Sequence, residues 1–322
     1  MSATFNWGLL STAKINLKIL QAAPHSIRGQ ILGVASRDAE RARAYAAEHG
    51  LARHYGSYAA MLADPDIHII YNGLPNSLHA EWTIKALEAG KHVLCEKPFA
   101  VTLAEVDAMH AAAQRAGRVV TEAFMYRHHP RTFKVKELIE SGALGPVRLL
   151  RSGFSFNMSG SPANVRWNKE LAGGSIWDVG CYPISLARYL FGAPSRVHGW
   201  KVLSASGVDE TFVGTLEFPG GQVAQFDSSF NFPHRVYAEI VGSAGSLYIE
   251  RPFQPSQPEH RLTLRRDGRP EEVIEIENPD MYWLEMEDLH DAILGGQPRI
   301  SAAETRGHIE TILALLAAAD QA

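Results

Sequence analysis

Residues 5–35 read FNWGLLSTAKINLKILQAAPHSIRGQILGVA, and this stretch decides the fold. It predicts an apolar strand at residues 5–10, a helix at residues 13–23 that Pro24 stops, and a second strand at residues 31–35. A strand, a helix and a strand of these lengths form a right-handed crossover between parallel strands. The start of the chain therefore predicts an α/β unit with a parallel sheet.

The same alternation of strands and helices continues to residue 121. Asp38 and Gly50 are suited to begin and end a helix at residues 39–49. The letters TLAE at residues 102–105 fit a capping box that opens a helix running to Gly117. The other elements expected here are strands at residues 67–71, 92–95 and 119–121 and a helix at residues 77–89. The pattern predicts that the parallel sheet is extended by repeated crossovers.

After residue 123 the pattern changes. Residues 195–276 alternate apolar and polar side chains, as in TFVGTLEF followed by PGG, which indicates a mostly antiparallel sheet with hairpin turns. Helices are expected at residues 132–140, 175–191, 282–294 and 302–319, with an extended segment at residues 147–156. We therefore expect two domains, residues 1–122 and residues 123–322, with a last helix that can pack back on the first domain.

Composition excludes several classes of protein. The chain has 322 residues, enough for two domains, and its 46% apolar and 20% charged residues are typical of a globular protein. A net charge of −4 gives no basic field for nucleic acid or anionic lipid. No stretch approaches the roughly 20 apolar residues of a membrane span. With two cysteines and no signal peptide at residues 1–7, the sequence predicts a cytoplasmic protein without nucleic-acid or membrane partners.

The turn after the first strand is the first candidate for binding a ligand. In a parallel sheet, ligands bind at the carboxyl ends of the strands, where backbone N–H groups can face a phosphate. Ser11, Thr12, Ala13 and Ile15 occupy the turn where a dinucleotide-binding protein has its glycine fingerprint. The small side chains still allow close approach of a ligand to the backbone. Without further motifs, an ordinary strand–helix turn explains these residues equally well.

The end of the second strand discriminates between nicotinamide cofactors. An NAD enzyme usually has a carboxylate here for the ribose hydroxyls, and an NADP enzyme has a cation for the 2′-phosphate. Ser36, Arg37 and Arg41 supply a hydroxyl and two guanidinium groups. Asp38 competes as a ribose ligand, although its role as a helix cap already explains it. These residues favour NADP over NAD.

Four motifs follow in a fixed order: LPNSLH at residues 74–79, CEKP at 95–98, EAFMYR at 122–127 and GGSIWDVGCYP at 173–183. With them the chain resembles, over nearly its whole length, the glucose–fructose oxidoreductase / inositol dehydrogenase / rhizopine-catabolism (Gfo/Idh/MocA) family. Within the family it is most similar to the NADP-dependent aldose dehydrogenases, dimeric dihydrodiol dehydrogenases and anhydrofructose reductases. The missing glycines in the first turn are a departure from the family pattern.

The resemblance implies a fold and an activity. The fold is an N-terminal Rossmann domain followed by an α/β domain with a large open, mostly antiparallel sheet. The activity is that of an NAD(P)-dependent oxidoreductase acting on the CH–OH group of an aldose or a related cyclic polyol. The resemblance also implies a homodimer or homotetramer assembled through the open sheet. Which sugar is the substrate, and in which direction the reaction runs, stay open.

The resemblance places Lys97, Asp178 and Tyr182 at the family's catalytic positions. Oxidation of an alcohol needs a base for the hydroxyl proton. A free tyrosine has a pKa of about 10, and a neighbouring ammonium such as that of Lys97 lowers such a pKa. Asp178 lies four residues before Tyr182, so both share one face of a helix. Pro183 should make this helix kink or restart. A solvated loop charge, a helix cap and a half-buried aromatic are the structural alternatives for the three residues.

Further cofactor contacts follow from the resemblance alone. They are Leu74, Pro75, Asn76, His79, Glu96, Lys97, Arg166, Trp167 and Tyr282. His79 could instead merely face the protein, although cofactor contact is favoured, and Tyr282 could equally be a core or surface aromatic. The adjacent His128 and His129 lack the spacing of metal ligands, and neither cysteine has a convincing partner base. We therefore expect no metal site and no thiol catalysis.

Two other functions stay open on the same fold. The family includes a galactose-pathway repressor that binds dinucleotide as a signal, so a non-enzymatic dinucleotide-binding regulator is one alternative. Some relatives use bound NAD in a redox cycle to cleave glycosides, so an NAD-dependent glycoside-processing enzyme is another. The presence of both Lys97 and Tyr182 favours catalysis over sensing.

Overall fold

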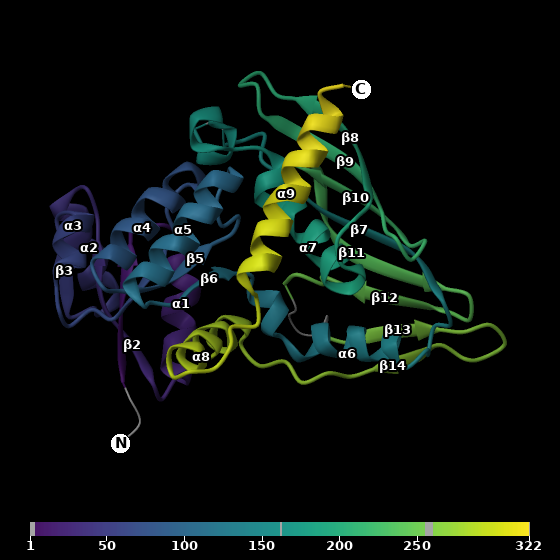
Figure 1. The fold of residues 1–322 in the computed structure, drawn as a ribbon, viewed down its shortest axis with the longest axis horizontal. Coiled ribbons are helices and arrows are strands. Elements are labelled where there is room, and N and C mark those ends of the chain that lie inside the picture. The colour runs from purple at the N-terminus through teal and green to yellow at the C-terminus, as the bar shows by residue number, and fades with distance from the viewer. Residues whose placement is uncertain (1–3, 162, 255–259, 322) are drawn as a thin grey trace. The chain divides into compact units, whose positions relative to one another are not determined.

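The computed structural model describes residues 4–161, 163–254 and 260–321 of the chain (Figure 1). The chain forms two compact units. The first comprises Met1–His128 and Pro279–Arg306, and the second comprises His129–Asn278 and Gly307–Ala322. A domain is a part of the chain that folds independently, and compactness alone does not show this. The predicted boundary between residues 122 and 123 therefore stays a prediction. No helix in the described ranges is long and apolar enough to cross a membrane.

The first unit is built on a six-stranded sheet. Its strands are β1 (Phe5–Leu10), β2 (Gly29–Ala35), β3 (Arg53–Tyr55), β4 (Ile69–Asn72), β5 (His92–Glu96) and β6 (Val120–Ala123). They lie in the order β3-β2-β1-β4-β5-β6, and every neighbouring pair is parallel. This is the strand order of a Rossmann fold, so the predicted parallel sheet is confirmed. A dinucleotide would bind where the strands end, beyond Leu10, Ala35 and Glu96.

Helices pack on this sheet, and their ends confirm the predicted caps. They are α1 (Asn16–Ala22), α2 (Ala39–His49), α3 (Tyr58–Leu62), α4 (His79–Glu88), α5 (Leu103–Ala116) and α8 (Met281–Ile293). The Asp38 carboxylate accepts the N–H of Arg41 at 3.1 Å, and Gly50 ends α2 with φ +66°. Thr102 and Glu105 form both bonds of a capping box at the start of α5.

Some element boundaries differ from the prediction. Helix α1 begins at Asn16 rather than at residue 13, because the chain is still turning at Ser11–Ile15. Pro24 lies inside a 3₁₀ turn, Ala23–His25, that follows α1 directly. The short elements β3 and α3 were not predicted, because three and five residues are too few for a periodic pattern.

The second unit is built on an eight-stranded sheet. Its strands are β7 (Val147–Asn157), β8 (Arg196–Leu203), β9 (Asp209–Glu217), β10 (Val223–Ser229), β11 (Asn231–Gly242), β12 (Ser246–Glu250), β13 (Leu262–Arg265) and β14 (Glu272–Ile274). They lie in the order β14-β13-β12-β11-β7-β10-β9-β8. All neighbours are antiparallel except β7 and β10. The predicted antiparallel sheet is confirmed, including the turn at residues 219–221 between β9 and β10.

The remaining helices are α6 (Pro130–Glu140), α7 (Cys181–Phe191) and α9 (Ala302–Ala319). Within the second unit, α7 lies against β7 and β10, and α9 contacts α7 through a 2.9 Å hydrogen bond from Arg188 to the Thr311 hydroxyl (Figure 1). On the other face of this sheet, the cross-strand neighbours Trp200 and Val213 are 53% and 42% exposed. The sheet therefore has one covered face and one open face.

Candidate active site

The turn after β1 adopts a conformation that usually requires glycine, although it contains none. Ser11 has φ +72°, in the left-handed region. Its hydroxyl oxygen accepts the N–H of Ala13 at 3.2 Å, and the side-chain amide of Asn16 donates to its carbonyl at 2.8 Å. Thr12 and Ile15 are half-buried beside it. Local hydrogen bonds thus hold the turn in a shape that leaves its backbone accessible.

Two cations stand at the end of β2. Arg37 and Arg41 are exposed, while Ser36 is buried and its hydroxyl oxygen accepts the N–H of Asp38 at 3.2 Å. Burial raises the pKa of the Tyr58 hydroxyl, and the positive charges of Arg37 and Arg41 oppose that rise. Asp38 is engaged as the cap of α2. The charge at this strand end is therefore positive, which fits a phosphate better than a ribose diol.

The segment after β5 is held by carboxylates from two strands. Glu96 accepts a hydrogen bond from the Tyr71 hydroxyl and, through its other oxygen, from the N–H of Lys97 at 3.3 Å. The buried Glu122 on β6 accepts the N–H of Phe99 at 3.0 Å. The backbone around the half-buried Lys97 is thus fixed on both sides. Sequence reasoning quoted Glu122 within a motif but assigned it no role.

His79 joins two of the predicted cofactor loops. Its side chain is 1% exposed, and its ring nitrogens lie 2.8 Å from the carbonyl oxygens of Leu74 and Pro98. Burial lowers the pKa of His79, and the two carbonyl contacts oppose this shift. Pro75 and Asn76 lie in the loop that His79 holds. These contacts support a role in fixing loop geometry, and direct contact of His79 with a cofactor stays a prediction.

Helix α8 adds two buried groups to the first unit. Tyr282 is 8% exposed and Glu285 is 1% exposed. Neither carboxyl oxygen of Glu285 has a hydrogen-bond partner among the described residues. Burial, together with the nearby charge of Glu96, raises the pKa of Glu285 well above its usual value, which favours the neutral carboxyl. Burial likewise raises the pKa of Tyr282.

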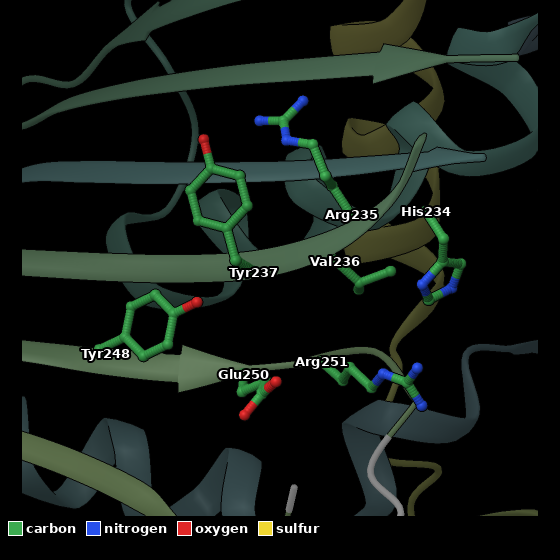
Figure 2. Close-up of a pocket in the computed structure, with 7 residues that line it drawn as sticks. All are labelled: His234, Arg235, Val236, Tyr237, Tyr248, Glu250 and Arg251. Atoms are coloured by element: carbon green, nitrogen blue, oxygen red, sulfur yellow. The ribbon is translucent and has the colours of Figure 1, made fainter. Parts of the chain in front are cut away.

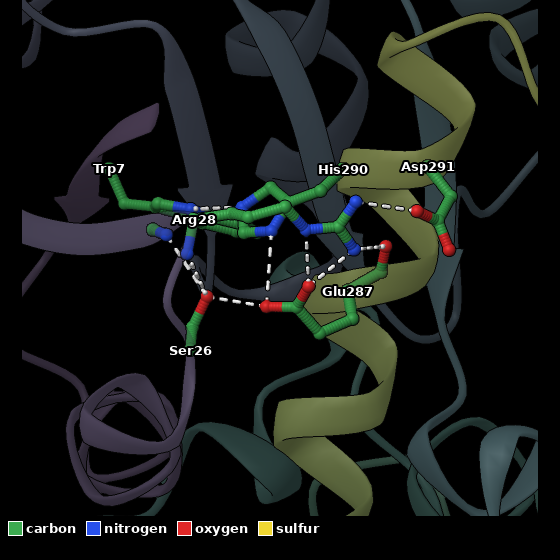
Figure 3. Close-up of polar contacts among 7 residues, drawn as sticks. Trp7, Ser26, Arg28, Glu287, His290 and Asp291 are labelled. Atoms are coloured by element: carbon green, nitrogen blue, oxygen red, sulfur yellow. Dashed lines mark hydrogen bonds and ion pairs between the residues drawn. The ribbon is translucent and has the colours of Figure 1, made fainter. Parts of the chain in front are cut away.

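A polar network fixes α8 on the sheet of the first unit (Figure 3). The indole N–H of Trp7 donates to Nε2 of the fully buried His290 at 3.0 Å. Arg28 donates to Glu287 and to Asp291, each at 2.6 Å. The helix lies more than 250 residues further along the chain than these partners. The periodicity of α8 predicts a helix, but nothing local predicts where it docks.

In the second unit, the segment GGSIWDVGCYP contains an unusual helix. Residues Ile176–Gly180 form a π-helix, and α7 starts directly after it at Cys181. Pro183 is therefore the third residue of α7, where a backbone N–H needs no acceptor within the helix. The structure has no break at Pro183: the predicted kink or restart takes the form of a change from π-helix to α-helix between Gly180 and Cys181. The wider π turn was not predicted, and such turns are frequent at functional sites.

Asp178 lies in the π-helix and is paired with Arg166. Nε of Arg166 donates to the Asp178 carboxylate at 2.5 Å, and the Asp178 side chain is 14% exposed. Trp167 is half-buried, and its ring meets the Phe230 ring edge-on with centroids 5.2 Å apart. The structure thus joins Arg166, which the sequence assigned to the cofactor, with the candidate catalytic Asp178.

Tyr182 is the second residue of α7 and is 5% exposed. Its ring packs against Phe154 and Phe253, with centroid distances of 5.5 and 5.3 Å. An aromatic ring fixed on two sides has little rotational freedom. The packing therefore determines the direction of the phenol group, as proton transfer requires.

A separate polar pocket of about 330 Å³ lies on β11 and β12 of the second unit (Figure 2). Its lining consists of His234, Arg235, Val236, Tyr237, Tyr248, Glu250 and Arg251. None of the residues predicted for the active site lines it, and Arg235 is already paired with Asp227 at 3.0 Å.

Metal and thiol chemistry find little support in the described part of the chain. It contains no group of three or more histidine, cysteine or acidic side chains that could hold a metal ion. Cys95 and Cys181 are buried, and burial raises the pKa of Cys95, which disfavours the reactive thiolate.

A Rossmann sheet followed by an open-faced antiparallel sheet defines a class of two-domain dinucleotide-dependent oxidoreductases. Comparison with known proteins assigns the family. Residues 6–124 match the model of the oxidoreductase family with an NAD-binding Rossmann fold, and residues 132–248 match the GFO/IDH/MocA C-terminal domain. The chain belongs to the Gfo/Idh/MocA family of oxidoreductases, which confirms the resemblance predicted from the motifs.

Three relatives illustrate the range of the family. D-xylose 1-dehydrogenase (NADP(+)) 2 of Haloferax volcanii is 38% identical over 318 residues, which cover 98% of this chain and 97% of the relative. Trans-1,2-dihydrobenzene-1,2-diol dehydrogenase of Mus musculus is 32% identical over 78% of this chain and 76% of its own. The crystal structure of an aldose-aldose oxidoreductase from Caulobacter crescentus, complexed with glycerol, matches with a TM-score of 0.90 and 28% identity, covering 99% and 98% of the two chains.

Proposed function

We propose that this oxidoreductase transfers a hydride between NADP(H) and the hydroxyl-bearing carbon of an aldose or a related cyclic polyol. The observation that carries the proposal is the Arg166–Asp178 pair next to Tyr182, on a helix that restarts at Cys181. An acid, its orienting partner and a phenol on one short segment suit the binding and deprotonation of a hydroxyl group. The xylose dehydrogenase of Haloferax volcanii, whose name specifies NADP, supports the same substrate class and cofactor.

The first unit offers a set of groups that fits NADP. The Ser11–Ile15 turn presents backbone N–H groups to the diphosphate, and Ser36, Arg37 and Arg41 hold the 2′-phosphate. Further contacts come from the loop at residues 74–76 and from Glu96, Lys97, Arg166, Trp167 and Tyr282. When bound, the nicotinamide ring supplies the site that accepts or donates the hydride. All other steps depend on side chains of this chain.

Tyr182 carries the proton in this proposal. Its phenolate takes the proton of the substrate alcohol during oxidation, and the hydroxyl so formed returns that proton during reduction. The ammonium of Lys97 stabilises the phenolate, because an opposite charge nearby favours the ionised form. Asp178, oriented by Arg166, accepts a hydrogen bond from a substrate hydroxyl and so positions the reacting carbon.

The decisive experiment follows NADPH absorbance with purified protein and a panel of aldoses, polyols and their keto forms, with product identification. We expect turnover with at least one aldose, and a loss of about 100-fold or more in kcat for Tyr182→Phe and for Lys97→Ala. NADPH affinity of Tyr182→Phe should match the wild type, since the phenol handles only the proton. No absorbance change with any substrate would contradict the proposal.

The same variants test the two alternatives. A dinucleotide-binding regulator would keep its biological output in Tyr182→Phe, because no proton transfer is needed. A glycoside-processing enzyme would convert its substrate without net reduction of the cofactor.

For the assembly, we propose a homodimer or homotetramer formed through the open face of the second-unit sheet. Trp200 and Val213, exposed side by side on neighbouring strands, support this, because contiguous exposed apolar side chains mark interaction surfaces. Light scattering of Trp200→Glu should show a shift towards monomer. An unchanged mass would contradict this interface.

A further inference from the structure

A buried carboxylate far from the GGSIWDVGCYP motif in sequence lies against the start of that motif's π-helix. Asp209, the first residue of β9, is 5% exposed. Its Oδ2 accepts two hydrogen bonds, from the Ser175 hydroxyl at 2.7 Å and from the N–H of Ile176 at 2.8 Å. Both donors are at the first turn of the π-helix. One oxygen of Asp209 thus holds this end of the helix on the sheet.

The other oxygen of Asp209 packs against Gly174. A Cβ atom at position 174 would lie 2.2 Å from Oδ1 of Asp209, and Gly174 has φ +118°. Only glycine combines this backbone angle with this approach. The carboxylate is therefore in contact with three consecutive residues, 174–176, which leaves it little freedom to move.

A second strand contacts both ends of the π-helix. The Ser228 hydroxyl on β10 lies 3.0 Å from the Ser175 hydroxyl. At the far end, a Cβ atom on Gly180 would be 2.9 Å from the same Ser228 oxygen. The helix therefore lies directly on β9 and β10, and Asp209 supplies the charged part of that contact.

A π turn is rare and persists only where its surroundings hold it. The bonds from Ser175 and Ile176 determine the residue at which the wide turn begins. Asp178 follows two residues later, and Tyr182 lies in the first turn of α7 after the π-helix ends. A shift of the starting residue would rotate both side chains, and a misplacement of about 1 Å can lower a rate about 100-fold.

We infer that Asp209 is a positioning residue, which anchors the start of the π-helix and so sets Asp178 and Tyr182 for proton transfer. This inference rests on the proposed function, because it assigns catalytic roles to those two residues. Asp209 itself touches neither substrate nor cofactor in this scheme. It acts through the backbone of residues 174–176.

The ionised form of Asp209 suits this role. Burial raises the pKa of Asp209 to about 6, although the Ser175 and Ile176 donors oppose the rise. Above that pH the group is a carboxylate, which forms stronger hydrogen bonds than a neutral amide or acid. A buried charge destabilises a fold unless it is well paired. Among the described residues its partners are neutral donors, so we attribute the retained charge to a requirement for precise geometry.

The test compares Asp209→Ala and Asp209→Asn with a matched control, Thr211→Val. Thr211 is two residues along the same strand, is buried, and makes a 2.7 Å hydroxyl contact with Ser229 that does not involve the π-helix. Ser175→Ala serves as a milder second variant, because it removes one of the two donors to Asp209. Three quantities are measured for each protein: kcat at saturating substrate, the Kd for NADPH, and amide hydrogen exchange of residues 173–183.

For Asp209→Ala we expect kcat to fall about 100-fold while the Kd for NADPH is unchanged, with faster exchange in residues 173–183. Asp209→Asn keeps one acceptor oxygen, so its kcat should be about tenfold higher than that of Asp209→Ala. The kcat of Ser175→Ala should be about tenfold below that of the wild type. Thr211→Val should keep its kcat within about twofold and its exchange in this segment at the wild-type rate.

The proposed role of Asp209 is refuted if the amide hydrogens of residues 173–183 exchange at the wild-type rate in Asp209→Ala, whatever the activity of the wild type. It is equally refuted if Thr211→Val loses as much kcat as Asp209→Ala. Failure of the proposed function has a different signature, since the wild-type protein itself would then show no NADP-coupled turnover with any sugar. The exchange measurement still decides whether Asp209 holds the segment in that case.

Discussion

Two tight backbone segments carry most of the candidate site, and they solve the same problem in opposite ways. The turn at residues 10–16 of the first unit places Ser11 at φ +72° without any glycine. The segment at residues 173–183 of the second unit uses Gly174 and Gly180, each pressed against a side chain of the sheet. Each segment holds its own backbone, and the candidate site residues on it, in a fixed position.

The difference shows that glycine is required for two separate reasons. A left-handed backbone angle costs a residue with a side chain about 1–2 kcal/mol, which local hydrogen bonds can offset. Ser11 accepts two such bonds, one from the N–H of Ala13 and one from the side-chain amide of Asn16. Close approach cannot be offset in this way, because an added Cβ would overlap Asp209 or Ser228. A serine can therefore replace glycine in the first segment but not in the second.

The largest effect is expected from Gly174→Ala. The added methyl group must displace Asp209 and adopt an unfavourable φ, and these two effects together should lower the free energy of unfolding by about 4 kcal/mol. Gly142→Ala is the matched control, since Gly142 has φ +75° with nothing within 4 Å of the new Cβ. It should lose only about 1 kcal/mol. Urea unfolding measures both, and equal losses would contradict the distinction.

Asp209→Asn should show a pH-dependent stability difference. The pKa of Asp209 is raised from 3.8 to about 6, and the groups facing it are the Ser175 hydroxyl and backbone N–H groups, which do not titrate in this range. The folded chain therefore binds this proton more tightly than the unfolded chain. The resulting stabilisation is complete below about pH 3.8 and lost as the pH rises through about 6.

Asparagine has no proton to lose, so Asp209→Asn should gain about 2–3 kcal/mol relative to the wild type between pH 4 and pH 7.5. Urea midpoints at these pH values measure the gain. Above pH 6, Asp209→Asn would then be more stable than the wild type but have a lower kcat. This combination is expected where a destabilising charge is retained for function. A difference that does not vary with pH would show that the pKa of Asp209 is the same in the folded and unfolded chains, so that burial does not raise it.

The sequence predicted the elements whose ends depend on neighbouring residues. The Asp38 and Thr102 caps act within one turn of their helices, so their residues alone were sufficient. Pro183 likewise indicated a restart, because proline clashes within its own helix. Most of the fold was therefore predictable.

What could not be predicted depends on contacts over long stretches of chain. The π-helix is held by Asp209, which lies 33 residues after Ile176. Helix α8 is docked by a bond between Trp7 and His290, 283 residues apart. The role of Glu122 was not predicted because it lies within a short buried strand, where its bond to Phe99, 23 residues away, leaves no sequence signal.

The preference for NADP over NAD can be tested at the end of β2, the strand next to the turn at residues 10–16. If a glycine-free turn binds the diphosphate, the 2′-phosphate contacts of Arg37 should account for much of the NADP preference. Arg37→Ala should weaken NADPH binding about tenfold, the size of one hydrogen bond to a charged group, and leave NADH binding unchanged. Arg43→Ala is the control, because Arg43 is exposed on α2 and paired with Glu40. Unchanged NADP kinetics in Arg37→Ala would remove this residue from the phosphate site.

The smallest effects are expected at Ser11 itself, and they separate the two reasons for glycine most cleanly. Ser11→Gly relieves the strain of φ +72° but loses the hydroxyl bond to Ala13, and glycine also has more freedom to lose on folding. These terms oppose each other, so the free energy of unfolding should change by less than about 1 kcal/mol. Ser11→Ala keeps the strain and loses the bond, so it should be less stable than Ser11→Gly by about 1 kcal/mol. If alanine proves as stable as serine, the hydroxyl does not hold the turn, and the bond from Asn16 must fix it alone.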